Sequence, residues 1–273
     1  MTRWGARRGG EFRSRYGRWA LVVGGSEGIG AEYAVALAEK GLDLLLVARR
    51  REPLDELSAR LRAEHGVAVT PLAIDAGAHD AVPDIAGATE GLDLGLLVCS
   101  AAFAPVQPFL EMPAGDLDRM LDLNCRLATG LGHLVGRRLV ERGRGGMIFM
   151  SSMAGTTGSA RIVQYAATKA YLRVLAEGLW AELAPRGVDV LACCPGQVHT
   201  PTFDGSQPRP PGRMAPPVME PGSVARAALA ALGRQPVLVP GRLNRVAAFA
   251  NQRLLPKRSA IDLISTATRR MYP

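Results

Sequence analysis

Short apolar runs alternate with amphipathic stretches along most of this chain. The run ALVVGG at 20–25 leads into GIGAEYAVALAEKG at 28–41, which has helical periodicity and ends in a glycine. We expect further strands at 42–48, 67–75, 92–101, 145–152, 188–196 and 235–241, and further helices at 52–65, 114–142 and 162–184. Such alternation is typical of βαβ units. It predicts an α/β fold with a doubly wound parallel sheet of about seven strands and helices on both faces, in three layers.

One region interrupts this rhythm. Residues 199–222 are rich in proline and carry no apolar periodicity. A loop of this length in a compact domain is more often a lid over a binding site than a structureless surface connection, so we predict a lid. The length of 273 residues suits one large domain or two small ones. Because no linker is evident, we place a single domain at 18–241.

The formal net charge of +8 is concentrated at the two ends of the sequence. Residues 1–18 carry a net +5 and residues 242–270 a net +6, so the remaining residues carry −3. A body without excess positive charge argues against nucleic-acid binding. Because the first residues lack the apolar segment of a secretory signal, we expect 1–17 to be a basic flexible leader. Residues 242–273 are expected to form a basic helical extension.

The cysteines and histidines show no spacing typical of a disulfide framework or a metal site. We therefore interpret the four cysteines as small apolar residues in a reducing compartment, expect a cytoplasmic protein and predict no metal. No apolar run reaches the ~18 residues that a membrane span needs, so no spanning helix is expected.

A glycine-rich turn lies between the first predicted strand and the first predicted helix. In such a turn the backbone can approach a pyrophosphate closely, and the helix N-terminus faces the phosphate charge. The strand and helix predicted on either side supply the context that a short glycine motif needs. The candidate cofactor-binding residues here are Gly24, Ser26, Glu27, Gly28, Ile29 and Gly30.

The second predicted strand ends in Ala48-Arg49-Arg50-Arg51. A dinucleotide fold holds the adenine ribose at this point, and an acidic residue there would select NAD. Arginine instead pairs with a 2′-phosphate, so Arg49 and Arg50 favour NADP as the cofactor. A solvated charge run that opens the next helix is the alternative.

Tyr165 precedes Lys169 by about one helical turn, and Ser152 lies upstream of both. A cation about 4 Å from a phenol is worth roughly 4 kcal/mol at an effective dielectric of about 20. We therefore expect Lys169 to lower the pKa of Tyr165 from ~10 towards neutrality, where proton transfer to a carbonyl oxygen is efficient. A surface pair on an amphipathic helix is the alternative for these two residues.

The chain resembles the single-domain short-chain dehydrogenases/reductases, which have a Rossmann fold, because their motifs occur here in the same order. These are strand–GGSEGIG–helix, Asn124, Ser152, Tyr165, Lys169 and Pro195-Gly196. The resemblance covers roughly 18–241. The family's TGxxxGxG turn falls on 23–30 with Val23 in place of the threonine, and its NNAG motif reads Cys99-Ser100-Ala101-Ala102 here. Three segments resemble those of an NADP-dependent bacterial branch of the family that includes hydroxysteroid dehydrogenases. They are FRSRYGRWALVVGGSEGIG, ATEGLDLGLL and SSMAGTTGS.

The resemblance implies further cofactor contacts and a mechanism. The additional cofactor-binding residues are Asp75, Ala76, Ser100, Ala101, Pro195, Gly196, Val198 and Thr200, together with Tyr165 and Lys169. Tyr165 would be the proton donor in reversible carbonyl reduction, and Ser152 would hydrogen-bond the reacting oxygen. Lys169 would lower the pKa of Tyr165 and hold the nicotinamide ribose, and Asn124 would hold a water in a proton relay to Lys169.

We expect the substrate to be a bulky hydrophobic ketone or alcohol, hydroxysteroid-like or lipid-like. The predicted pocket residues are Ala102, Phe103, Met153, Ala154, Thr157, Gln164, Phe203 and Met214. A catalytically silent NADP-binding sensor or scaffold is the alternative from another class. The two long helices at 114–142 and 162–184 are the expected contacts of a homodimer or homotetramer.

The C-terminal extension carries an apolar stripe of Leu243, Val246, Phe249 and Leu254 beside an arginine-rich face. Because Pro256 ends this helix early and the stripe is narrow, we expect it to cover the substrate mouth or make a subunit contact. A helix lying in a membrane interface is the alternative.

Overall fold

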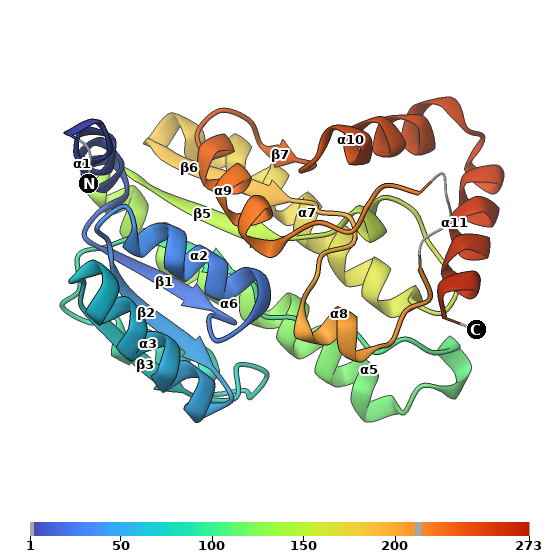
Figure 1. Cartoon of the computed structure of the whole chain (residues 1–273), viewed down its shortest axis with the longest axis horizontal. Coiled ribbons are helices and arrows are strands. Elements are labelled where there is room, and N and C mark those ends of the chain that lie inside the picture. Colours follow the sequence, from blue (N-terminus) through green and yellow to red (C-terminus); the bar gives the residue numbers. More distant parts are fainter. Residues whose placement is uncertain (1–2, 211–214, 273) are drawn as a thin grey trace.

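The computed structural model describes residues 3–210 and 215–272, and its centre is a seven-stranded parallel sheet (Figure 1). The strand order is β3-β2-β1-β4-β5-β6-β7. The strands are β1 (Trp19–Val23), β2 (Asp43–Ala48), β3 (Val69–Ala73), β4 (Leu94–Cys99), β5 (Gly145–Met150), β6 (Val188–Cys193) and β7 (Val237–Leu238). The predicted doubly wound sheet is confirmed, and the order changes direction beside β1, where such folds bind their ligands.

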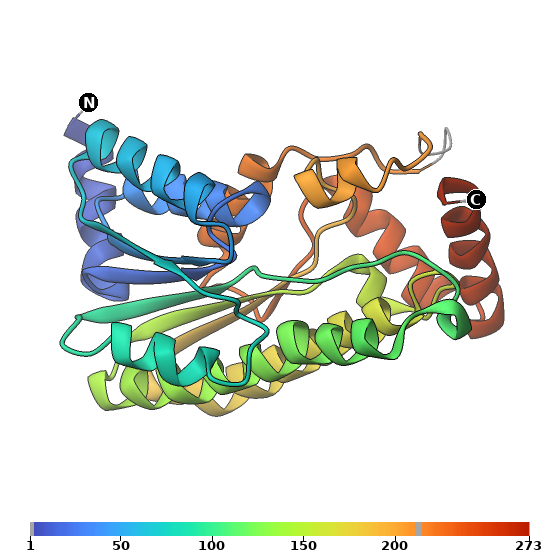
Figure 2. The same cartoon turned by 90° about the horizontal axis from the view of Figure 1, so that it is seen from below.

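Helices cover both faces of the sheet, so the molecule has three layers (Figure 2). Strands β2, β4 and β5 are buried at every position, which explains their unbroken apolar runs. One buried apolar cluster includes Leu37, Leu54 and Val224, and the other includes Leu131 and Leu172. The helices are α2 (Gly28–Ala38), α3 (Arg51–His65), α4 (Ala81–Ala88), α5 (Ala114–Leu121), α6 (Leu127–Arg142), α7 (Val163–Leu183), α8 (Pro201–Gly205) and α9 (Pro221–Ala231).

The helix predicted at 114–142 is interrupted. A π-helical turn at Asp122–Arg126 separates α5 from α6, and it holds Asn124 in the interior. The predicted last strand, 235–241, is also shorter than expected, because only Val237 and Leu238 pair with β6. The proline-rich segment 199–222 contains α8 and is tied to the end of β6 by hydrogen bonds between Met219 and both Gln197 and His199.

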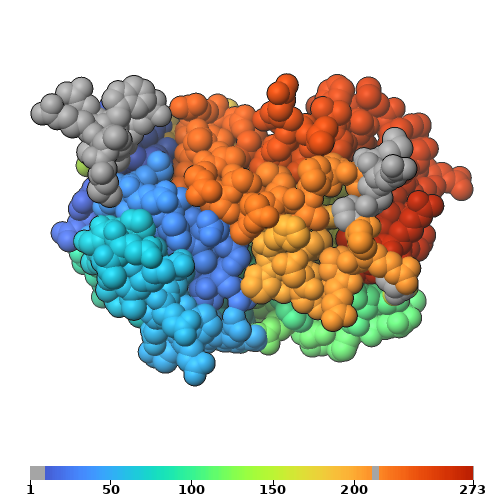
Figure 3. Space-filling view, in the orientation of Figure 1, coloured from blue at the N-terminus to red at the C-terminus, as the bar shows by residue number. Residues whose placement is uncertain are grey.

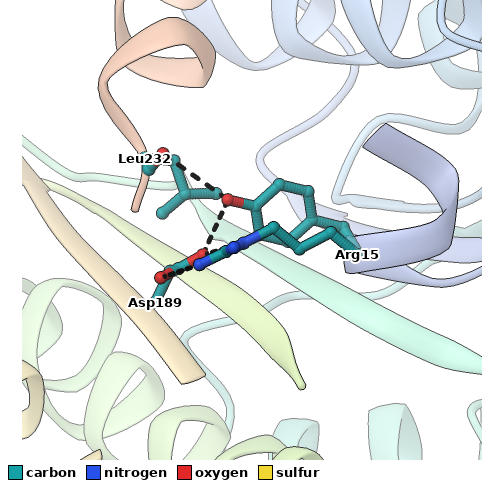
Figure 4. Close-up of polar contacts among 4 residues, drawn as sticks. Arg15, Asp189 and Leu232 are labelled. Atoms are coloured by element: carbon teal, nitrogen blue, oxygen red, sulfur yellow. Dashed lines mark hydrogen bonds and ion pairs between the residues drawn. The ribbon is translucent and has the colours of Figure 1, made fainter. Parts of the chain in front are cut away.

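The expectation of a flexible leader at 1–17 is wrong for the described residues. Residues Arg3–Tyr16 form helix α1, whose C-terminal part packs at the end of the sheet opposite the C-terminal helices (Figure 1). Tyr16 is buried, and its hydroxyl donates to Asp189 of β6 at 2.8 Å. Arg15 reaches the same carboxylate at 2.6 and 2.7 Å (Figure 4). Helix α1 is therefore anchored to the sheet through Asp189, which is distant from it in the sequence.

The C-terminal extension is helical as predicted. It comprises α10 (Arg242–Phe249), a π-helical turn (Ala250–Leu254) and α11 (Lys257–Met271). Pro256 separates the two helices, as its missing N–H and its ring require. Among the described residues, no helix is both long and apolar enough to cross a bilayer.

Candidate active site

The glycine-rich turn between β1 and α2 is shaped by two close backbone approaches. Gly24 has a φ of +84°, and a Cβ there would lie 2.5 Å from the backbone nitrogen of Ala101. A Cβ on Gly30 would lie 1.9 Å from the carbonyl oxygen of Gly24. Only glycine fits at these positions. The turn therefore leaves the first turn of α2 open to an approaching phosphate.

Backbone hydrogen bonds hold this turn although Val23 replaces the family's threonine. The amides of Gly24 and Gly25 donate to the Val47 carbonyl at 2.8 and 3.1 Å. The amides of Ser100 and Ala101 donate to the Val23 carbonyl at 2.9 Å each. The segment Cys99–Ala102 thus supports the turn through backbone amides. This support does not require the asparagine side chains of the family's NNAG motif.

Arginines stand where the structure would receive the ribose end of a dinucleotide. Arg49 and Arg50 follow β2 and line the same cavity as the glycine turn. Arg50 pairs with Glu27 of the turn, whereas Arg49 has no carboxylate within ion-pair distance among the described residues. Asp75 lies across the cavity and pairs with Arg119 at 3.2 Å. The free guanidinium of Arg49 can accept an additional anionic group.

Ser152, Tyr165 and Lys169 converge on one cavity of about 650 Å³. Ser152 follows β5, and its Oγ accepts from the Ala154 amide at 3.1 Å and lies 3.5 Å from the Pro195 carbonyl. Lys169 is buried on α7, and its Nζ donates to the Met150 carbonyl at 2.7 Å. This Nζ lies 5.5 Å from the centre of the Tyr165 ring. The predicted grouping of serine, tyrosine and lysine is therefore present.

The expected lowering of the Tyr165 pKa is not what this structure gives. Burial raises the pKa of Tyr165, the Ser152 hydroxyl counters part of that rise, and the nearby Tyr272 adds to it. Burial lowers the pKa of Lys169 from 10.5 to about 8. Burial is thus the main influence on the pKa of Tyr165, and Lys169 is itself desolvated.

Asn124 does not line the cavity; it braces the loop that follows β4. Its Oδ1 accepts from the Phe103 amide at 2.8 Å, and its Nδ2 donates to the Phe103 carbonyl at 3.0 Å. The same Nδ2 donates to the Thr168 hydroxyl at 3.1 Å. The π-helical turn points this side chain at both partners. All the observed hydrogen bonds of Asn124 are thus structural, and its part in a proton relay stays a prediction.

The remaining predicted residues mostly line the cavity. Every predicted cofactor residue does so, as do Ala102, Phe103, Met153, Ala154, Thr157 and Phe203. Gln164, which precedes Tyr165 at the start of α7, is not among the described residues that line the cavity, so its part in the pocket stays a prediction. Met214 lies outside the described residues.

The C-terminal extension was expected to cover the substrate mouth or to make a subunit contact, and it forms one wall of the cavity, whose individual residues were not predicted from the sequence. Asn251, Thr268, Met271 and Tyr272 are among the cavity residues. Three polar links fix this wall to the segment between Ser152 and Tyr165. In Figure 3 the C-terminal residues, in red, lie at one end of the molecule. The links are Asn251 Nδ2 to Thr157 Oγ1 at 2.9 Å, Ser159 Oγ to Thr268 Oγ1 at 2.9 Å and the Ala160 amide to Ser265 Oγ at 3.1 Å. The small and polar residues on the inner face were the available signal.

Known proteins share this arrangement. Residues 18–210 match the short chain dehydrogenase family. The chain is 33% identical over 234 residues to the 7beta-hydroxysteroid dehydrogenase of Clostridium sardiniense, covering 86% of this chain and 89% of that enzyme. A solved structure from work on 7beta-hydroxysteroid dehydrogenase stereoselectivity superposes with a TM-score of 0.87 at 26% identity, over 93% of this chain and 98% of the other.

A second solved structure is a short-chain dehydrogenase from Sphingobium yanoikuyae in complex with NADPH. It superposes with a TM-score of 0.75 at 32% identity, over 86% of this chain and 93% of the other. The chain therefore belongs to the short chain dehydrogenase family, and it is an oxidoreductase that uses a nicotinamide cofactor on CH–OH groups.

Proposed function

We propose that this protein is an NADP(H)-dependent dehydrogenase that interconverts a ketone and a secondary alcohol on a bulky hydrophobic substrate, with Tyr165 as the general acid and base. The observation that carries the proposal is the meeting of Ser152, Tyr165 and Lys169 in a cavity that also contains the glycine turn. One end of this cavity suits a dinucleotide, and the other end is walled by apolar groups.

Arg49 is the basis for preferring NADP(H). It follows β2, has no carboxylate partner among the described residues, and lines the cavity beside Arg50. The residue directly after β2, where an acidic side chain would bind a ribose hydroxyl, is Arg49. A titration should therefore show tighter binding of NADPH than of NADH, and equal affinities would contradict this preference.

In the proposed reaction the bound cofactor supplies or accepts the hydride. The Tyr165 hydroxyl gives its proton to the carbonyl oxygen, and the raised pKa of Tyr165 keeps this proton in place until substrate binds. The Ser152 hydroxyl donates a hydrogen bond to the same oxygen and orients it. Lys169, held by the Met150 carbonyl, lies next to the phenol and stabilises the phenolate that remains.

The walls of the substrate end support a bulky apolar substrate. Phe103, Met153 and Phe203 line this end from one side, and Ala247, Ile264 and Met271 line it from the C-terminal helices. Such apolar groups, beside polar side chains such as Asn251 and Thr268 that can orient a ligand, suit a large hydrophobic molecule with a polar substituent. The relative from Clostridium sardiniense is a 7beta-hydroxysteroid dehydrogenase, which agrees with this substrate class.

Two structural roles belong to the same proposal. We propose that the segment 199–222 acts as a lid, because Phe203, Ser206 and Pro216 all border the cavity. We also propose a homo-oligomer that pairs α7 across a twofold axis. Tyr171, Val174 and Trp180 are exposed apolar residues on that helix and would be covered in such a contact.

The test is NADPH oxidation with a panel of steroid and lipid-like ketones beside small polar sugars. Tyr165→Phe should lower kcat by ~10²–10⁴-fold, the range of a lost general acid. Tyr171→Phe is the matched control, since Tyr171 lies on the same helix but contacts Thr129 on the surface. Near-normal turnover of Tyr165→Phe, or a preference for sugars, would contradict the proposal. NADPH binding without turnover on any ketone would favour a silent sensor or scaffold.

A further inference from the structure

The polarity of helix α10 and the π-helical turn after it is inverted. Their buried side chains include Asn244, Ala248 and Asn251, which are polar or small. Their exposed side chains include Leu243, Val246, Phe249 and Leu254, each 60–66% exposed. We call these four residues the outer apolar stripe. A helix that covers a core normally shows the opposite pattern, with apolar residues inward. The helix borders the cavity with its polar and small face, and the stripe points away from the cavity.

Buried contacts prevent the helix from rolling to bury the stripe. Asn244 donates to the Pro240 carbonyl at 3.0 Å and packs against Gly196, where a Cβ would come within 2.8 Å of its Oδ1. Asn251 donates to Thr157 on the other side of the cavity. Rotation would break these hydrogen bonds and leave the carbonyl of buried Pro240 and the hydroxyl of buried Thr157 without these partners, which is costly. The outward direction of the stripe is thus built into the fold.

Cations surround the stripe. Arg242 and Arg245 are exposed on α10, and Arg253, Lys257 and Arg258 are exposed just after it. In the part of the chain that the structure describes, none of these five has a carboxylate within ion-pair distance. A second copy docked on the stripe through a twofold axis would bring the same cations together. An acidic surface with an apolar interior complements both the charge and the stripe.

We propose that α10 and the turn after it form a docking surface for anionic lipid bilayers. The outer apolar stripe would enter the boundary between headgroups and acyl chains, and the five cations would lie at the level of the phosphates. The helix would lie in the plane of the interface. Ala247, Ala248 and Asn251 face the cavity from the same segment, so the docked surface lies directly above the substrate end of the site. The docking itself does not depend on the proposed function.

The test is co-sedimentation of the full chain with vesicles of phosphatidylcholine, with and without phosphatidylglycerol. We expect binding to the anionic vesicles that weakens as salt is added. Phe249→Ser should reduce the partition coefficient about tenfold or more, and Arg242→Gln with Arg245→Gln roughly fivefold for each charge. Leu110→Ser is the matched control, because Leu110 is 94% exposed and lies outside the C-terminal helices.

Two outcomes would overturn the proposal. One is that the protein does not sediment with anionic vesicles, or that Phe249→Ser and Leu110→Ser reduce its sedimentation equally. The other is a change of molecular mass in solution on Phe249→Ser with no change in lipid binding, which would assign the stripe to a second copy of the chain. Because Leu243, Val246 and Phe249 are exposed, these variants should keep the wild-type circular dichroism, which separates docking from folding.

Discussion

The contact between α1 and the sheet gives a stability prediction. Asp189 of β6 accepts three hydrogen bonds, two from the Arg15 guanidinium and one from the Tyr16 hydroxyl (Figure 4). Asp189→Asn keeps the size of the side chain but removes its charge. The buried Tyr16 hydroxyl then faces a neutral amide in place of a carboxylate, which is a weaker acceptor. Its only other partner among the described residues is the distant Leu232 carbonyl at 3.5 Å.

The magnitude follows from the burial of each partner. The Asp189 side chain is 12% exposed and the Arg15 side chain 55%, so solvent screens the ion pair and it contributes about 1 kcal/mol. The hydrogen bond from buried Tyr16 to a charged acceptor adds about 1–2 kcal/mol. We therefore expect Asp189→Asn to lower the free energy of unfolding by about 2–3 kcal/mol. The loss comes from α1, far from the active site.

Urea denaturation followed by circular dichroism measures this effect. With a slope of about 2–3 kcal/mol/M, the midpoint should fall by about 1 M. Asp55→Asn is the control, since it breaks the exposed Arg51–Asp55 pair of 3.7 Å and should cost less than about 0.5 kcal/mol. If Asp189→Asn were no more harmful than Asp55→Asn, the contact would not be what holds α1 to the sheet.

Three other predictions concern the site. Arg49→Ala should weaken NADPH binding by ~10–100-fold and leave NADH binding nearly unchanged, which fluorescence titration measures; a matched loss for both cofactors would contradict the assignment. Asn124→Ala should lower the free energy of unfolding by about 2–4 kcal/mol, because it leaves the Phe103 backbone groups and Thr168 without their partner. An unchanged urea midpoint would contradict this. Burial lowers the pKa of Lys169 from 10.5 to about 8. Between about pH 8 and pH 10.5, Lys169 is therefore protonated in the unfolded chain and neutral in the folded chain. The contribution of Lys169 to stability therefore rises with pH across that window by at most about 3 kcal/mol, and the difference between wild type and Lys169→Met should show it.

Sequence reasoning succeeded where the determinants are local. The continuous apolar run 44–48 of β2 reflects a sheet that is covered on both faces, and the pattern alone indicates this. The turn at Gly24–Gly30 requires glycine for steric reasons that the motif displays. The convergence of Ser152, Tyr165 and Lys169 also follows from chain order, because β5 and α7 meet at the carboxyl end of the sheet.

The errors concern interactions between distant residues. Residues 3–16 show no apolar periodicity, and their C-terminal part is held by Asp189, which no local pattern reveals. The Tyr165 pKa depends on how far both groups are desolvated, which spacing does not give. The outer apolar stripe was recognised, but its direction is set by Asn244 and Asn251, whose partners lie elsewhere in the chain.

The links between the C-terminal helices and the segment after Ser152 determine when the site becomes complete during translation. The glycine turn, Ser152, Tyr165 and Lys169 are all made before the wall residues Asn251 and Thr268. At ~5–20 residues per second the ribosome needs several seconds to cover that interval. A nascent chain therefore acquires its phosphate-facing turn and catalytic group first, and its substrate pocket is enclosed only after α11 has emerged and docked. A chain that stopped before α11 would contain the glycine turn, Ser152, Tyr165 and Lys169 but lack the wall residues Ile264, Thr268 and Met271.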